Sequence, residues 1–201
     1  MASEERIGTS DGVPGPVHAD LRRYLVSAVD EFVRGYPVAG IHLDFVRWYE
    51  GAASKPRTAA ATMTSFVASV RTRMRSTRPA MWLTAAVLAG YSSCAASVGQ
   101  DWEAWIDRGL VDYAVPMNDF ENGAAYAAVV SKQANTRHRA RHLISGIGVT
   151  ANECMLSPVQ VIDQVNAARR AGVAGVALFD LDQTLALRVL PVLRLGLFRD
   201  R

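Results

Sequence analysis

One short stretch, Gly40-Ile41-His42-Leu43-Asp44-Phe45, is mostly apolar and is typical of a β-strand that carries a carboxylate near its end. A helical pattern comes before it and is stopped by Gly35-Tyr36-Pro37. The same order, an amphipathic helix followed by a short apolar strand, then recurs along the chain. The predicted strands cover residues 38–46, 82–88, 111–117, 143–149 and 173–179.

The clearest helix start is Ser157-Pro158-Val159-Gln160, with a capping serine, proline at the first helical position and glutamine at the third. Apolar strands that alternate with helices indicate an α/β fold whose parallel sheet is covered on both sides. A doubly wound sheet and a (β/α)8 barrel both fit. No Gly-x-Gly-x-x-Gly turn or Walker loop follows any strand, which disfavours the nucleotide-binding form. Helices are predicted near residues 20–34, 58–77, 99–108, 123–135, 158–171 and 184–197.

The chain has 201 residues, of which 50% are hydrophobic, and this is enough for one domain with a core. Residues 1–16 are rich in glycine and proline and are predicted to form a flexible leader, with the domain at 17–201. No apolar run is long enough to span a membrane, and the N-terminus has no signal-peptide core. We therefore expect a cytoplasmic protein, provided that Met1 is the true start.

The net charge is +3, and arginines cluster at residues 71–75 and 137–141. Such clusters suggest nucleic-acid binding, but each lies at the end of a helical pattern, where cations complement the helix dipole and cover surface. No aromatic residues alternate with them, so no nucleic-acid partner is expected. Cys94 and Cys154 are read as buried thiols rather than a disulfide, and no metal motif or cofactor is indicated.

Asp44 is the most informative candidate for chemistry. In parallel α/β folds, active sites lie at the carboxyl ends of the strands. Alternation along the strand places His42 and Asp44 on one face, and a carboxylate buried in an apolar strand is costly unless it is paired or functional. The residues leave two roles open: a catalytic acid, base or nucleophile, or a structural carboxylate paired with Arg47.

Other polar residues gather after the later strands, and each has a structural alternative to a functional role. His42 either holds a substrate hydroxyl or is a satisfied interior histidine, and Trp48 is a candidate for stacking on a sugar. Helix capping competes with substrate contact at four further positions, which are Asn118, Asp119, Asp180 and Asp182.

The segment from Tyr36 to Trp48 resembles the fourth-strand motif of the glycosyl-hydrolase-like family 10 proteins, which are bacterial TIM barrels. In that family the motif usually reads Gly-Ile-His-Leu-Asp-Tyr-Ile-Arg-Tyr-Pro. The order and spacing agree over about residues 18–183. Further matches are Gly99-Gln100-Asp101-Trp102, Trp105, Gly109-Leu110-Val111-Asp112-Tyr113, Val115-Pro116-Met117-Asn118, Gly146-Ile147-Gly148 and Leu156-Ser157-Pro158.

The resemblance implies a partial TIM (β/α)8 barrel, with five parallel strand–helix units that correspond to barrel strands four to eight. The first three units are then missing. Asp119 stands where the family usually has tyrosine, and Tyr49-Glu50 replaces the usual proline. The segment Asp180-Leu181-Asp182 is more acidic than usual.

The resemblance further implies a glycoside hydrolase that cleaves an O-glycosidic bond with two carboxyl groups. Asp44 is the first of these, and Asp119 is the leading candidate for the second, ahead of Asp180, Asp182 and Glu50. A carbohydrate substrate is expected. The alternative is a non-catalytic barrel remnant that binds carbohydrate or self-associates through its open sheet edges. The residues proposed to contact the substrate are His42, Arg47, Trp48, Asn118 and Asp182.

Overall fold

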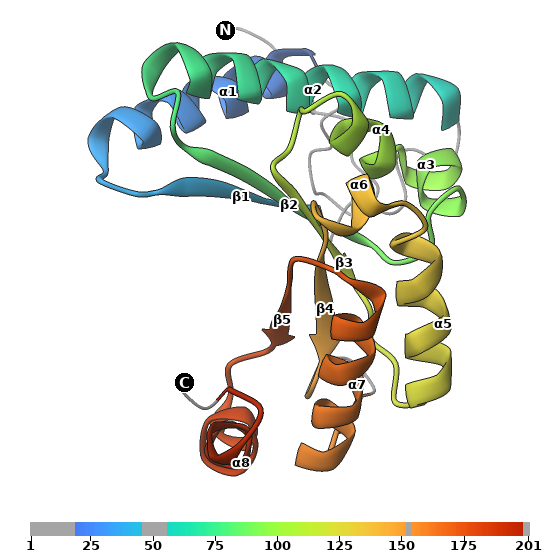
Figure 1. The fold of residues 1–201 in the computed structure, drawn as a ribbon. Helices are drawn as coiled ribbons and strands as arrows, with labels where there is room; N and C mark the ends of the chain where they lie inside the picture. Colours follow the sequence, from blue (N-terminus) through green and yellow to red (C-terminus); the bar gives the residue numbers. More distant parts are fainter. Residues whose placement is uncertain (1–18, 46–55, 152–153, 199–201) are drawn as a thin grey trace, which may run out of the picture. The chain divides into compact units, whose positions relative to one another are not determined.

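The computed structural model of the chain describes residues 19–45, 56–151 and 154–198, shown in colour in Figure 1. The chain divides into two compact units, with the boundary between Asp112 and Tyr113. The predicted leader at 1–16 lies outside the described residues, and the prediction of one domain over 17–201 stays a prediction.

The N-terminal unit contains two strands, which pair in parallel. His42 lies opposite Thr84, and Asp44 lies opposite Ala86. The helices of this unit begin and end close to the predicted positions, apart from one short helix that was not expected from the sequence. Its elements are α1 (Ala19–Gly35), β1 (Gly40–Asp44), α2 (Pro56–Thr77), β2 (Trp82–Leu88), α3 (Ser93–Val98) and α4 (Trp102–Asp107).

The core of the N-terminal unit forms where helix side chains meet one face of the strands. Leu83 and Val87 of β2 are fully buried, as are Trp102 and Trp105 of α4. These two tryptophans therefore belong to the core. Other buried residues of this core are Val33, Leu43, Phe45, Met63, Phe66, Val67, Val70, Met74, Ala85 and Ile106.

Arg71 is not a surface cation, contrary to the interpretation of its cluster. Its guanidinium makes two hydrogen bonds to the carboxylate of Asp112, at 2.9 and 2.6 Å. The side chain of Arg71 is 6% exposed and that of Asp112 is 33% exposed. The same carboxylate accepts a bond from the backbone nitrogen of Leu83 at 2.6 Å, so it ties α2 to β2.

The C-terminal unit contains three strands that lie side by side in the order β3, β4, β5 (Figure 1). Ile144 to Gly148 of β4 pair in parallel with Gly175 to Phe179 of β5, and Ala114 of β3 bridges in parallel to Leu143. Its elements are β3 (Tyr113–Met117), α5 (Gly123–Gln133), α6 (Arg137–Ala140), β4 (Ile144–Gly148), α7 (Pro158–Ala171), β5 (Gly175–Phe179), a π-helical turn η1 (Leu185–Val189) and α8 (Leu190–Leu195).

Helix α7 begins as the sequence predicts. The Ser157 side chain accepts a bond from the Gln160 backbone, and the Gln160 side chain accepts one from the Ser157 backbone, which completes a capping box. The hydrophobic core of this unit packs α5, α7 and the C-terminal helical turns against one face of β4 and β5. Its members include Tyr126, Val130, Ile147, Val149, Leu156, Val161, Val165, Leu185, Val189 and Leu193, with Val176 and Leu178 packed against them.

Cys94 and Cys154 are both free and buried, as predicted. Among the helices that the structure describes, none combines the length and apolarity that crossing a membrane requires.

Candidate functional site

Asp44 is the last residue of β1, and its side chain is exposed rather than buried. Leu43 is buried against the helices, so alternation directs His42 and Asp44 to the opposite face, as predicted. The expectation of a buried carboxylate was wrong, because no helix of the N-terminal unit's described residues covers that face. Because Asp44 is exposed, the energetic cost of burying a carboxylate no longer supports a functional role for it. The argument for a functional role is now its position at the carboxyl end of a parallel strand.

His42 shares this face and is hydrogen-bonded to the neighbouring strand. Its Nδ1 lies 2.7 Å from Oγ1 of Thr84. Desolvation by surrounding protein atoms lowers the pKa of His42, and the nearby charge of Asp44 partly opposes that effect. The imidazole is therefore held in a fixed orientation and is mostly neutral at pH 7. The bond to Thr84 fits a structural role for His42, but its side chain is exposed, so the interpretation of an interior histidine was wrong in that respect.

Asn118 follows β3 and belongs to a buried polar network. Its amide and that of Gln133 bond each other reciprocally, at 2.8 and 3.1 Å. Asn118 Nδ2 also donates to Oγ of Ser145 at 3.0 Å, and that hydroxyl lies 2.8 Å from the Tyr126 hydroxyl. Burial raises the pKa of Tyr126 to about 12, although its bond to Ser145 opposes the shift. The network fixes the end of β3 against β4 and α5.

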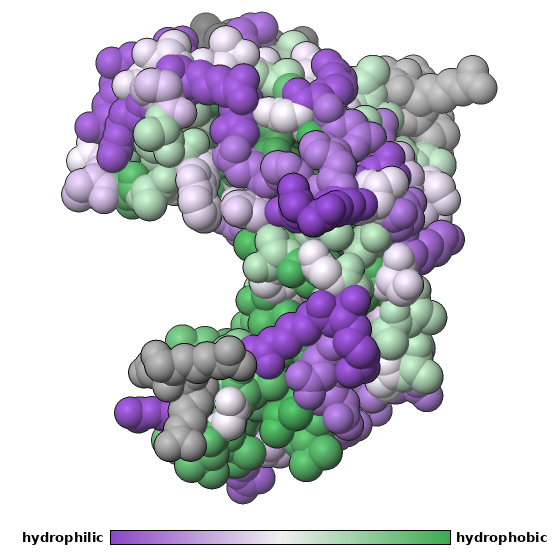
Figure 2. Space-filling view, in the orientation of Figure 1, coloured by the Kyte–Doolittle hydropathy of each residue, from purple (hydrophilic) through white to green (hydrophobic). Residues whose placement is uncertain are grey.

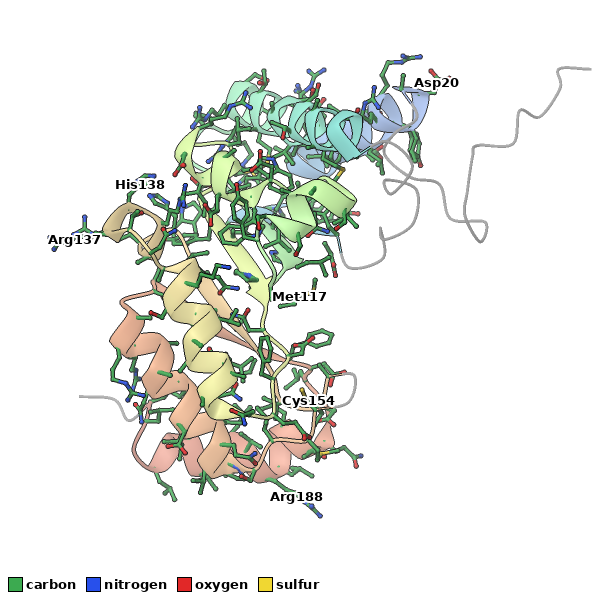
Figure 3. The ribbon with its side chains drawn as sticks, turned by 90° about the vertical axis from the view of Figure 1, so that its right-hand side faces the viewer. Asp20, Met117, Arg137, His138, Cys154 and Arg188 are labelled. Carbon is green, nitrogen blue, oxygen red and sulfur yellow. The ribbon has the colours of Figure 1, made fainter. Side chains whose placement is uncertain are left out.

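Asp119 comes directly after Asn118 and points the other way. Met117, labelled in Figure 3, is the last residue of β3. Asn118 contacts the helix side of the sheet, whereas the Asp119 carboxylate lies over Gly148 of β4, where a Cβ atom would collide with it. Neither residue caps α5, because the side chain of Asn122 does so. Of the two, the structure leaves Asp119 with the position suited to chemistry.

Asp180 and Asp182 follow β5 and have different roles. Oδ1 of Asp180 accepts a hydrogen bond from Oγ1 of Thr150 at 2.8 Å, which ties together the segments after β4 and β5. Oδ1 of Asp182 accepts from the backbone nitrogen of Leu185 at 2.7 Å. Asp182 therefore caps the last helical segment, which was one of its two predicted roles.

The C-terminal unit thus brings together the ends of three strands. Asp119 from β3 contacts Gly148, and Asp180 from the end of β5 bonds Thr150, two residues further along the same strand end. Sequence reasoning missed Thr150 and the purpose of Gly148, although the Gly146-Ile147-Gly148 motif signalled that another chain segment approaches here closely. Asp44 belongs to the N-terminal unit. Three further candidates, Arg47, Trp48 and Glu50, lie outside the described residues.

The described residues support neither a cysteine nucleophile nor a metal centre. Burial raises the pKa of Cys94 to about 11, so its thiol is protonated at neutral pH and is a poor nucleophile. The described residues also contain no group of three or more His, Cys, Asp or Glu side chains arranged to hold a metal ion.

Comparison with solved structures finds proteins with a similar fold. The chain is similar to the glycoside hydrolase domain of PgaB (BpsB) from Bordetella bronchiseptica, with a TM-score of 0.66, 11% identity, and coverage of 90% of this chain and 63% of that chain. It is also similar to a GH18 chitinase from Pseudoalteromonas aurantia, with a TM-score of 0.58, 16% identity, and coverage of 85% and 66%.

Comparisons with protein families and with curated proteins find no match. The chain therefore has an α/β fold with parallel strands that resembles the fold of glycoside hydrolase domains, and it spans 63% of the PgaB domain's length. At these identities the likeness concerns the fold alone.

Proposed function

We propose that the protein is a glycoside-hydrolase-like enzyme built on an incomplete (β/α)8 barrel. The observation that carries this proposal is the placement of Asp44, Asp119 and Asp180 at or just after the carboxyl ends of parallel strands. The fold shared with two glycoside hydrolase structures supports it. Membership of the family 10-like proteins is part of the proposal and rests on the strand motif around Asp44.

Glycoside hydrolysis uses one carboxyl group to protonate the leaving oxygen and a second to attack the sugar or to activate water. The candidates for these roles are Asp44 in the N-terminal unit, and Asp119 followed by Asp180 in the C-terminal unit. Asp182 is a weaker candidate for either role, because one of its carboxylate oxygens caps a helix. Asn118 is a weaker candidate for contacting the substrate, because it is fully buried and is hydrogen-bonded to Gln133 and Ser145.

Substitution of the carboxylates tests the proposal. Hydrolysis is measured on a panel of polysaccharides that includes chitin oligosaccharides, because one structural neighbour is a chitinase. Asp44→Asn and Asp119→Asn are each expected to lower kcat by roughly 10²–10⁴-fold, the usual contribution of a general acid or base. Asp163→Asn is the matched control, since Asp163 is an exposed carboxylate on α7.

Equal rates for wild type and Asp44→Asn would remove Asp44 from the mechanism. A loss in Asp180→Asn without one in Asp119→Asn would give the second role to Asp180. If no substrate of the panel is cleaved but one is bound, the second candidate function applies, which is a non-catalytic carbohydrate-binding remnant. The observation that favours this alternative is that β1 and β5 each show a pairing partner on one side only among the described residues.

A further inference from the structure

Strand β5 has an edge without a partner among the described residues. It pairs with β4 on one side. The carbonyl of Phe179 accepts bonds from Val149 and Thr150 on that side. Backbone polar groups alternate in direction along a strand, so those of Gly175 and Ala177 also face β4. The N–H and C=O groups of Val176 and Leu178 therefore point to the open edge.

This edge lacks the features that normally prevent strands from pairing with another molecule. Exposed edges usually carry a charge, a proline or a bulge. The strand Gly175-Val176-Ala177-Leu178-Phe179 has no charged residue and no proline. By contrast, β1 carries both His42 and Asp44. Compared with β1, the strand β5 is therefore the better template for adding a further strand.

We propose that the open edge of β5 binds the same edge of a second copy of this chain. A twofold axis relates the two copies of a symmetric dimer, so two identical edge strands meet antiparallel. Centring the axis on Ala177 places Ala177 opposite its own copy, Val176 opposite Leu178, and Gly175 opposite Phe179. Val176 and Leu178 then exchange both backbone hydrogen bonds, which satisfies the groups that face the edge.

Side-chain sizes fit this register. Phe179 is 63% exposed, and its opposite position is the glycine at 175, which leaves space for the ring. Absence of charge along the strand means that no like charges face each other across the junction. Large apolar side chains are also exposed nearby in the sequence, on the helical turns after β5, with Leu187 73% and Leu195 78% exposed. Figure 2 shows a largely hydrophobic surface over α8.

Charge substitution at Ala177 tests the register without disturbing the unit's core. Val176 and Leu178 pack toward the helices, so Ala177 points to the opposite face, and it is partly exposed. Light scattering and sedimentation should show the full-length wild type as a dimer. Ala177→Lys and Ala177→Glu should each weaken dimerisation about tenfold or more through like charges at the axis. An equimolar mixture of the two variants should restore dimers.

Cross-linking gives a second readout. Residues opposite each other at a non-hydrogen-bonded antiparallel position are about 4.5 Å apart at Cα, which is within disulfide range. Ala177→Cys should therefore form a covalent dimer under mild oxidation. Ala174→Cys is the control, because the register separates its two copies by roughly 20 Å along the strands.

A wild type that stays monomeric at high concentration overturns the proposal, as does a dimer that both charge variants leave intact. Failure of the mixed charge variants to associate, or cross-linking at residue 174 in place of 177, overturns the register. This inference is independent of the hydrolase proposal, because association and hydrolysis are measured separately and Ala177 is not among the proposed catalytic residues.

Discussion

The carboxylate of Asp119 lies directly over the Cα atom of Gly148, on the strand next to its own. Gly146, two residues earlier, is approached by a different group: a Cβ atom there would stand 2.5 Å from the backbone carbonyl oxygen of Pro116. Gly148 thus leaves space for the side chain of Asp119, and Gly146 leaves space for the backbone at Pro116.

Alanine at these two glycines should therefore have different effects. Gly146→Ala presses on a backbone that cannot rotate away, and we expect it to lower the free energy of unfolding by about 1–3 kcal/mol. Gly148→Ala presses on the Asp119 side chain, which can rotate, so it should cost less stability but displace the carboxylate. Urea denaturation measures the first effect. If Asp119 is catalytic, Gly148→Ala should lower kcat at nearly wild-type stability, and an unchanged kcat would argue against it.

Asp112 should give the N-terminal unit a dependence on pH. Desolvation raises its pKa, but the hydrogen bonds from Arg71 and from the Leu83 backbone outweigh this and hold the pKa below the ordinary value of 3.8. A carboxyl group with a lowered folded-state pKa stabilises fully above its unfolded pKa, and that stabilisation is lost as the pH falls through the folded pKa. The Asp112 contribution should therefore be complete above about pH 4 and decline below it.

Asp112→Asn tests this dependence. The variant leaves the nearly buried Arg71 without its anionic partner, and breaking a buried pair costs roughly 3–5 kcal/mol. We expect the lower end of that range, because the Asp112 side chain is 33% exposed. The difference in unfolding free energy between wild type and variant should shrink below pH 4. A difference that stays constant down to pH 2 would contradict the assignment to this ion pair.

The amide pair of Asn118 and Gln133 should behave as a unit. Asn118→Leu leaves the buried amide of Gln133 without its partner, at an expected cost of about 1–3 kcal/mol. The double variant Asn118→Leu with Gln133→Leu removes both polar groups and should cost less than the sum of the single variants. Additive costs in thermal unfolding would show that the two amides do not depend on each other.

Asp182 should tolerate asparagine but not alanine. Asparagine also accepts a hydrogen bond at a helix N-terminus, whereas loss of the cap costs about 1 kcal/mol. We therefore expect Asp182→Asn to retain wild-type stability and Asp182→Ala to lose about that amount in chemical denaturation. A marked loss of hydrolysis in the stable Asp182→Asn variant would instead require a role for the negative charge.

The strands and the start of α7 could be predicted because their signals are local. Apolar runs between helices mark the strands, and the capping box at Ser157 and Gln160 lies within four residues. The short helices α3 and α6 were missed because six and four residues carry too little periodicity to detect. The candidate carboxylates could be placed at the strand ends, since this placement follows from chain order, and their role in chemistry stays a prediction.

The partners of the site residues could not be predicted, because they come from distant parts of the chain. Arg71 bonds Asp112 across 41 positions, and Asp180 bonds Thr150 across 30. The exposure of Asp44 depends on which elements cover a sheet face, and no pattern within its own strand contains that information. Asp119 was predicted to be catalytic and Asn118 to contact the substrate, although alternation alone directs adjacent residues to opposite faces.

Strand β4 is narrow on the face that carries Asp119, because Gly146 and Gly148 leave only backbone there. The Asp119 carboxylate leans over Gly148, and Asp180 bonds Thr150 just after the same strand. The carboxylates that come from the ends of β3 and β5 are thus both directed toward the end of β4. A side chain at residue 148 would fill the space that the Asp119 carboxylate occupies, so the missing side chain of one glycine lets the two acidic strand ends converge.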